Sequence, residues 1–579
     1  MIGGTRAGQG TRQGIEETMR LAEALGTLRD ALAATRYPLS LPDAGEAART
    51  AAATRAQLED YLLPRLARLD APLLVVVGGS TGAGKSTLVN SIVREPVSAA
   101  GARRPTTRDP VLVCHPDDAA WFSEAHLLPG LGRTTSGEGG LRIVPSERLT
   151  AGLALLDAPD IDSVVESNRA LAERLLAAAD LWLFVTTATR YADAVPWELL
   201  RDARARGTAI ALVLDRLPAD ADAEVTPHLT EMLAENGFGE APMFVVPETT
   251  LDSQRLLPEP VVAEVRGWLD SLARSAADRA AVVRQTVDGA VAALDPTVAT
   301  LAAAADAQVE AAETLETSAR SAYEEAGKSV ERGIRDGALL RGEVLARWQE
   351  LVGAGEFMRG LQARVARWRD RVDDAVTGRP RPAEQFQTAL ESGVVTFVRG
   401  AAADAAEQTA AAWRAHPAGS ALLKAHGELA APAEDLGLRL DRLVRDWQRS
   451  VLELVRAESG NRIAYARAGA YAVNGLGLVV MISVFAATAF IPTGAEIAVG
   501  AGTTIAAQKV LEAIFGDQAV RQLAAKARKD LLDRVDALLD EEADRFRAVL
   551  DDSGIDRSAG STLRAAAAAV AQARLGEAR

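Results

Sequence analysis

The stretch "VVVGGSTGAGKSTLVNSIV", Val75 to Val93, decides the fold of this 579-residue chain. An apolar run leads directly into GxxxxGK[ST], and an amphipathic helical pattern follows. In this context the motif forms a phosphate-binding loop, because its glycines let backbone N–H groups face the phosphates and the helix N-terminus adds a favourable dipole. The residues predicted to bind a nucleotide here are Gly79, Ser80, Thr81, Gly82, Ala83, Gly84, Lys85, Ser86 and Thr87.

Candidate chemistry lies in the loop and in two later segments. Lys85 can reach the β- and γ-phosphates, and the Ser86 hydroxyl can bind Mg²⁺. "LLDAPDIDSV" (155–164) ends an apolar run in Asp157, which can hold Mg²⁺ through water. "RRPTTRDP" (103–110) places a threonine where it can close onto the metal as a switch, or form a Pro-Thr turn.

The patterning predicts an α/β P-loop domain with a parallel-rich sheet, together with a large all-α part. Short apolar runs that alternate with helical stretches are the expected strands Leu153–Leu156, Leu181–Thr186, Ala209–Leu214 and Met243–Val246. The expected domains are N-terminal helices (1–70), the P-loop domain (71–257), a helical stalk (258–467), a hydrophobic hairpin (468–516) and C-terminal helices (517–579). Breaks are expected at "GRPRPAE" (378–384), "AHPAGSA" (415–421) and "DDSGIDRSAG" (551–560).

The net charge, the cysteine content and the first residues indicate which partners and which cellular compartment to expect. A net charge of −15 makes nucleic acid an unlikely partner. The single cysteine, Cys114, excludes a disulfide framework and is predicted to be a buried, inert thiol in reducing cytosol. The polar start "MIGGTRAGQGTRQG" gives no expectation of an export signal.

These motifs together resemble the TrmE–Era–dynamin side of the P-loop GTPases, over about residues 72–248. "GSTGAGKSTLVN" resembles the first motif of that family, "PTTRD" its switch I and "DAPDIDS" its switch II. The resemblance implies that Thr107 binds Mg²⁺ beside Ser86 and Asp157, and that GTP is the substrate. The helix-rich remainder and the late apolar segment further resemble a bacterial dynamin-like protein, in which flanking helices join into a neck beside the G domain.

The chain departs from the family pattern at several positions. Asp160 replaces the switch II glycine whose N–H touches the γ-phosphate, which predicts a slower or differently gated switch. Asp215 and Arg216 occupy the base-reading motif: Asp215 either accepts from guanine or is an ordinary strand-end aspartate, and Arg216 can stack as a lysine stem would. Pro218 replaces the guanine-binding aspartate. Thr81 stands where dynamins carry a catalytic glutamine, so slow intrinsic turnover is expected with Lys85, Thr107 and Thr81 as catalytic candidates.

A transport-type ATPase is the competing P-loop class. "SGEGG" (136–140) precedes the Asp157 strand as a transporter signature would. However, Ala158 stands where such ATPases need a general-base glutamate, and the gap after the phosphate loop is short. "SGEGG" is therefore interpreted as a β-hairpin turn.

The segment from Ala468 to Ala507 contains one charged residue, Glu496, and predicts a membrane-contacting helical hairpin. Basic residues on both sides would keep both ends on the cytoplasmic side. A buried core hairpin and a single span are the alternatives. The candidate membrane residues are Leu478, Val480, Phe485, Phe490 and Ile491.

The sequence thus favours a dynamin-like GTPase that hydrolyses GTP with Mg²⁺ and binds or remodels membrane through residues 468–516. Such a protein is expected on the cytoplasmic side of the cell membrane, as a homo- or hetero-oligomer through its stalk or G domain. The alternatives are a soluble regulatory GTPase that acts on a protein or RNA partner with the hairpin buried, and a nucleotide-binding scaffold that barely hydrolyses.

Overall fold

The computed structural model describes residues 4–99, 110–124, 127–129, 131–134, 140–161, 166–336, 382–458, 482–483 and 517–577. The chain divides into two compact units. The first unit comprises Met1–Tyr37, Asp43–Ala307 and Asp556–Arg579, and the second comprises Pro38–Pro42 and Gln308–Ile555.

The first unit contains an eight-stranded sheet in the order β3-β4-β2-β5-β1-β6-β7-β8. Every neighbouring pair is parallel except β2 and β5, which are antiparallel. The predicted parallel-rich sheet is therefore confirmed. The strands are β1 (Leu73–Gly79), β2 (Val111–Cys114), β3 (Arg133–Thr134), β4 (Leu141–Pro145), β5 (Leu153–Asp157), β6 (Leu181–Thr187), β7 (Ala209–Leu217) and β8 (Met243–Pro247).

One expectation about this sheet is wrong. A hairpin through "SGEGG" requires antiparallel strands, but β3 and β4 pair in parallel, with Arg133 opposite Leu141. Glycine and serine content marked the connection without fixing the direction of its strands.

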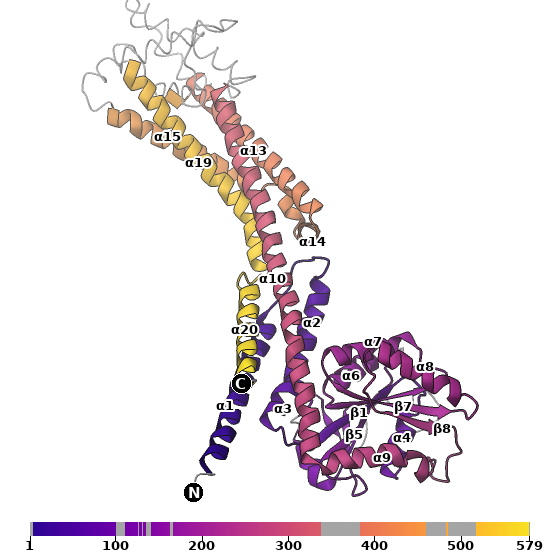
Figure 1. Ribbon diagram of the computed structural model, residues 1–579. Coiled ribbons are helices and arrows are strands. Elements are labelled where there is room, and N and C mark those ends of the chain that lie inside the picture. Colours follow the sequence, from indigo (N-terminus) through magenta and orange to yellow (C-terminus); the bar gives the residue numbers. More distant parts are fainter. Residues whose placement is uncertain are drawn as a thin grey trace, which may run out of the picture. The chain divides into compact units, whose positions relative to one another are not determined.

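Helices cover both faces of the sheet, which explains why its central strands are continuous apolar runs. Figure 1 shows α6 and α7 on one side of the sheet and α4 and α9 on the other. Every residue of β1, β5 and β6 is buried. The helices are α4 (Lys85–Val93), α5 (Ala119–Ser123), α6 (Glu166–Ala177), α7 (Ala194–Ala205), α8 (Asp222–Glu235) and α9 (Glu259–Arg274).

The two ends of the chain meet within the first unit. Helix α1 (Gly4–Ala34) packs along α20 (Ala559–Glu577), as Figure 1 shows. Leu28 and Leu563 are both fully buried in the core that these helices share with the sheet. Between α1 and β1 run α2 (Ala44–Gln57), η1 (Leu58–Leu62) and α3 (Leu63–Ala67).

Two helices lie differently from the boundaries expected from the sequence. Helix α9 follows residue 257 but packs on α4 and β8, because its strongly amphipathic face buries Val262, Val265 and Leu269 there. Helix α19 (Asp517–Asp552) belongs to the second unit, so only α20 of the C-terminal segment lies beside α1.

The described residues of the second unit form helices and no strand, which confirms the predicted all-α part of the fold. It contains the later part of α10 (Ala276–Arg335), α13 (Pro382–Ala415), α14 (Pro417–Ala425), η4 (Gly427–Ala430), α15 (Leu436–Glu458) and α19. Trp413 packs edge-on against Phe546, with ring centroids 5.2 Å apart. The indole of Trp447 donates to the carbonyl of Ala527 at 2.8 Å, so this core is hydrogen-bonded as well as apolar.

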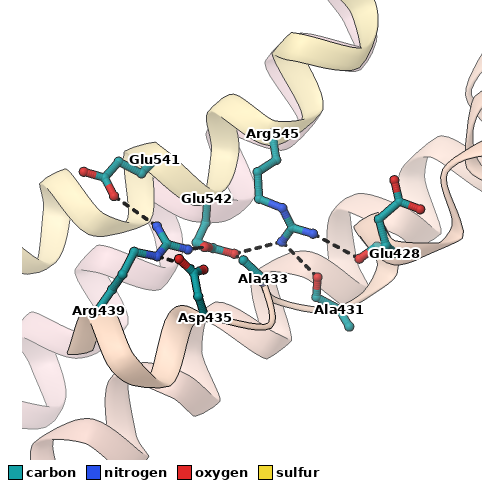
Figure 2. Close-up of polar contacts among 8 residues, drawn as sticks. All are labelled: Glu428, Ala431, Ala433, Asp435, Arg439, Glu541, Glu542 and Arg545. Carbon is teal, nitrogen blue, oxygen red and sulfur yellow. Dashed lines mark hydrogen bonds and ion pairs between the residues drawn. The ribbon is translucent and has the colours of Figure 1, made fainter. Parts of the chain in front are cut away.

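A buried carboxylate fixes the loop before α15 to α19 (Figure 2). Glu542 is fully buried and accepts from Arg439, from Arg545 at 2.9 Å and from the backbone N–H of Ala433 at 2.9 Å. Arg439 also bonds the exposed Glu541, at 3.0 Å. The carboxylate is compensated by two cations and an amide, as a buried charge requires.

Among the described residues, only α10 is long and apolar enough to cross a membrane by length and composition. The predicted hairpin residues Leu478, Val480, Phe485, Phe490 and Ile491 lie outside the described residues. Within that segment Ile482 and Ser483 are described, and both are buried; Ile482 belongs to the core of the second unit.

Candidate nucleotide-binding site

The phosphate loop connects the end of β1 to the start of α4, as its motif predicts. Gly79, Gly82 and Gly84 have φ angles of 154°, 75° and 99°, which side chains rarely allow. A Cβ on Gly79 would collide with the backbone carbonyl of Val185, and one on Gly84 would collide with the carboxylate of Asp215. The glycines therefore permit both the turn and the close approach of β6 and β7.

Lys85 lies at the first position of α4 and is 5% exposed. Its ammonium donates to the carbonyls of Gly79 at 2.8 Å and Ser80 at 3.2 Å. The third acceptor is the carboxylate of Asp160, with Nζ 2.5 Å from Oδ1. Because an ammonium has three donors, these contacts use its full hydrogen-bonding capacity.

Asp157 ends β5 beside the phosphate loop and is fully buried. Its Oδ2 accepts from Ser86 Oγ at 2.6 Å and also from the hydroxyl of Ser98. Its Oδ1 is buried without a hydrogen-bond partner among the described residues. Burial is the main cause that raises the pKa of Asp157, and the two serine hydrogen bonds act in the opposite direction.

Ser98 was not found from the sequence, because no motif marks it. Two reciprocal hydrogen bonds hold it: Asn90 Nδ2 donates to its carbonyl and its own N–H donates to Asn90 Oδ1, both at 2.8 Å. Ser98 is 4% exposed. Helix α4 therefore positions the hydroxyl that restrains Asp157.

The end of β7 approaches the loop from the other side. The guanidinium of Arg216, a residue with φ of 54°, donates to the carbonyl of Gly82. Asp215 lies against Gly84, and its Oδ1 is buried and unpartnered among the described residues. Burial raises the pKa of Asp215 to about 6.

Pro218 follows without a side-chain acceptor for a base. Its neighbour Leu217 pairs with Pro247 and accepts from the N–H of Glu248 at 2.9 Å. The loop after β8 therefore lies next to the altered base-reading segment.

The structure brings the predicted site residues together where it describes them. Asp160 contacts Lys85, Asp157 contacts Ser86, and the segment Asp215–Arg216 contacts Gly82 and Gly84. Thr107 lies outside the described residues. Cys114 is buried, and burial with the nearby Asp118 raises its thiol pKa to about 12, as expected of an inert thiol.

The sequence also did not predict the buried ion pair between Arg65 and Asp180, which directly precedes β6. Asp180, between α6 and β6, accepts from Arg65, from Tyr61 at 3.0 Å and from the N–H of Leu74 at 2.7 Å. The carbonyl of Asp180 accepts from Thr286 of α10 at 2.9 Å. The network ties η1, α3 and α10 to the sheet that carries the phosphate loop. Each of its other members lies more than a hundred residues from Asp180 in the sequence, and no local pattern links them to it.

Comparison with known proteins finds a family model that matches part of the chain. Residues 74–216 match the model of the 50S ribosome-binding GTPase family. No curated protein matches the chain.

Two solved structures cover nearly the whole chain at low similarity. A bacterial dynamin pair, described as oligomerised and as sensing and tethering membranes at long range, has 11% identity and a TM-score of 0.42, covering 93% of this chain and 96% of its own. LeoA, a bacterial dynamin GTPase from ETEC, has 11% identity and a TM-score of 0.24, covering 98% and 99%.

Proposed function

This chain contains a P-loop GTPase domain, and we propose that it is a dynamin-like protein that couples GTP hydrolysis to membrane binding or remodelling. The observation that carries the enzymatic part is a set of three contacts on the phosphate loop: Asp160 with Lys85, Asp157 with Ser86, and Arg216 with Gly82. Asp157 and Asp160 come from the end of β5 and Arg216 from the end of β7, at the carboxyl edge of the sheet, where ligands of such sheets bind.

Mg²⁺ suits the residues beside the loop. Ser86 Oγ and Asp157 would hold it, together with Thr107 of switch I, and Asp157 offers a buried oxygen with no partner among the described residues. Oxygen donors are the ligands that Mg²⁺ prefers. When bound, the ion supplies positive charge to the phosphate oxygens.

The protein's own contribution to hydrolysis is positioning and charge stabilisation. The loop amides and Lys85 bind the phosphates while water attacks the γ-phosphate in line. The position directly after Asp157, where a transport-type ATPase needs its glutamate base, holds Ala158, and the residue after Asp160 is the apolar Ile161; both are fully buried. Thr81 stands where dynamins carry a glutamine that could orient the attacking water. Turnover is therefore slow until a partner or second copy completes the site.

Guanine recognition rests on the end of β7, which holds Asp215 and Arg216. Arg216 covers the loop from the base side, and Asp215 supplies a carboxylate that can accept two parallel hydrogen bonds from guanine N1–H and N2–H₂. Adenine offers no such pair of donors. The matching GTPase family model favours this assignment over a transport-type ATPase.

The membrane part rests on residues 468–516 and on the layout of the helices. The pairing of α1 with α20 brings both ends of the chain to the G-domain unit, as in a neck, while a long helical unit lies between them in the sequence. The apolar segment lies between α15 and α19 in the sequence, and we propose that it contacts lipid from the cytoplasmic side. Oligomers would form through the stalk or the G domain.

A second candidate, a soluble regulatory GTPase, is favoured by one observation. Ile482 lies inside the apolar segment and is 1% exposed in the core of the second unit. In that case the segment is a core hairpin and the partner is a protein or RNA.

Vesicle flotation separates the two candidates. The full-length protein should float with vesicles of phosphatidylethanolamine and phosphatidylglycerol, and Phe485→Asp should prevent flotation while leaving GTP turnover in solution unchanged. If the wild type stays with the soluble fraction and Phe485→Asp lowers only thermal stability, the soluble candidate is correct.

A further inference from the structure

The ion pair between Lys85 and Asp160 satisfies the lysine that the nucleotide needs. Its atoms are 2.5 Å apart, and the two side chains are 5% and 20% exposed. The other two acceptors of Lys85 are the backbone carbonyls of Gly79 and Ser80, which belong to the loop itself. A phosphate oxygen can therefore gain Lys85 as a donor most readily by displacing the Asp160 side chain.

The backbone around Asp160 is held more firmly than its carboxylate. Ala158 and Ile161 are fully buried, and the N–H of Ala158 donates to the carbonyl of Val77 at 3.2 Å. Asp160 itself is partly exposed between them. Its side chain can rotate away while the chain on both sides keeps its place.

Asp160 is also an anion where a second anion arrives. When a γ-phosphate takes Lys85, the Asp160 carboxylate loses a charge-assisted hydrogen bond and remains beside an added negative charge. Both effects oppose binding of the third phosphate. A diphosphate lacks that group, and the loop amides at the start of α4 can hold its β-phosphate while Lys85 keeps Asp160, so it does not impose the same exchange.

We propose that Asp160 determines the preference between diphosphate and triphosphate, by acting as a built-in counter-anion of Lys85 that the γ-phosphate must displace. The proposal rests on the proposed function, because it requires that the phosphate loop binds guanine nucleotides. It assigns this chain a resting state in which the loop lysine is satisfied internally, and a bias toward GDP.

Binding of fluorescent GDP and a non-hydrolysable GTP analogue to the full-length protein tests the proposal. Asp160→Asn keeps the shape and removes the charge, and Asp160→Ser provides a second variant with a shorter side chain. Each should tighten binding of the GTP analogue by about tenfold or more, the effect of one charge-assisted hydrogen bond, with GDP affinity unchanged within about twofold. Asp193→Asn, which removes the same charge from an exposed position before α7, should leave both affinities unchanged.

The outcomes distinguish a failure of the Asp160 proposal from a failure of the proposed function. If both nucleotides bind and the Asp160 variants leave the ratio of their affinities at the wild-type value, Asp160 is not the discriminating residue, and the proposed function stands. If neither wild type nor variants bind a guanine nucleotide, the proposed function and this inference are both wrong.

Discussion

Ser98 donates its hydroxyl to Oδ2 of Asp157, the same oxygen that accepts from Ser86 Oγ at 2.6 Å. Two donors on one oxygen restrict the rotation of the carboxylate and leave Oδ1 without a hydrogen-bond partner among the described residues. Ser98 thus acts on the proposed Mg²⁺ site as a positioning residue, although it lies outside every motif.

Ser98→Ala should lower the apparent affinity for Mg²⁺, measured from GTP turnover, by about 10- to 100-fold. This is the usual effect of losing a hydrogen bond to a metal ligand. A magnesium titration of turnover measures this. Ser123→Ala removes a hydroxyl that donates to the carbonyl of Ala119 in its own helix, away from Asp157, and serves as the control. An unchanged titration curve in Ser98→Ala would show that Asp157 does not need this restraint.

The stability of the G domain should depend on pH through Asp215. Burial raises the pKa of this carboxyl from 3.8 to about 6, so the folded state binds the proton more tightly than the unfolded state does. The contribution of the Asp215 carboxyl to the free energy of unfolding is greatest below about pH 4. It falls by roughly 3 kcal/mol as the pH rises through about 6. Asp215→Asn should remove this fall, so that above pH 6 the variant is at least as stable as the wild type.

Urea unfolding at several pH values measures the difference in the free energy of unfolding between wild type and Asp215→Asn. Hydrogen exchange of the β7 amides reports the same difference locally. Asp220→Asn changes the charge of an exposed turn and is the matched control. A difference between wild type and Asp215→Asn that stays constant from pH 4 to pH 7 would contradict the prediction.

The Arg65–Asp180 pair should be essential to the first unit. Both side chains are 0% exposed, so Asp180→Asn would leave the Arg65 guanidinium buried with its main counter-charge removed. The free energy of unfolding should fall by about 3–5 kcal/mol. Hydrogen exchange of β1 amides reports it, because Leu74 donates to the Asp180 carboxylate.

An exposed ion pair in the same unit provides the comparison. Arg55 and Glu59 are 3.9 Å apart and about half exposed, so Glu59→Gln should cost at most about 0.5 kcal/mol. Equal losses in Glu59→Gln and Asp180→Asn would mean that burial does not set the strength of the Asp180 network.

Two adjacent glutamates on α19 should differ sharply in their effect on the second unit. Glu542 is 0% exposed between two arginines, whereas Glu541 is 62% exposed and shares Arg439 with it. Glu542→Gln should lower the free energy of unfolding by about 3 kcal/mol, and Glu541→Gln by about 0.5 kcal/mol. Hydrogen exchange across α19 and α15 compares the two substitutions. Similar effects of both would contradict the conclusion that the buried Glu542 carboxylate, shown in Figure 2, stabilises the second unit.

Much of the G domain could be predicted because its signals are local. The glycines and Lys85 of the phosphate loop stand between a strand and a helix, and each strand expected from an apolar run is present within a few residues. The helix breaks also carry local signals: α13 ends before Pro417, and Gly554, with φ of 79°, separates α19 from α20.

The rest depends on contacts between distant residues. The sequence marked Asp160 as a departure from the family and predicted a slower or differently gated switch, but it did not predict the pairing with Lys85 across 75 positions. Ser98 and Asp180 have no motif, because a single serine or aspartate gains its role only from the partner that the fold brings to it. The direction of β3 relative to β4 was likewise decided by the sheet and not by the loop between them.

The most direct test of the account is steady-state hydrolysis of GTP and of ATP by the full-length protein, with and without phosphatidylglycerol-containing vesicles. We predict that GTP is hydrolysed slowly in solution and faster with vesicles. Lys85→Ala should lower that rate by at least about 100-fold, because it removes a principal charge on the phosphates. ATP should not be turned over. Hydrolysis of ATP without hydrolysis of GTP would contradict the account.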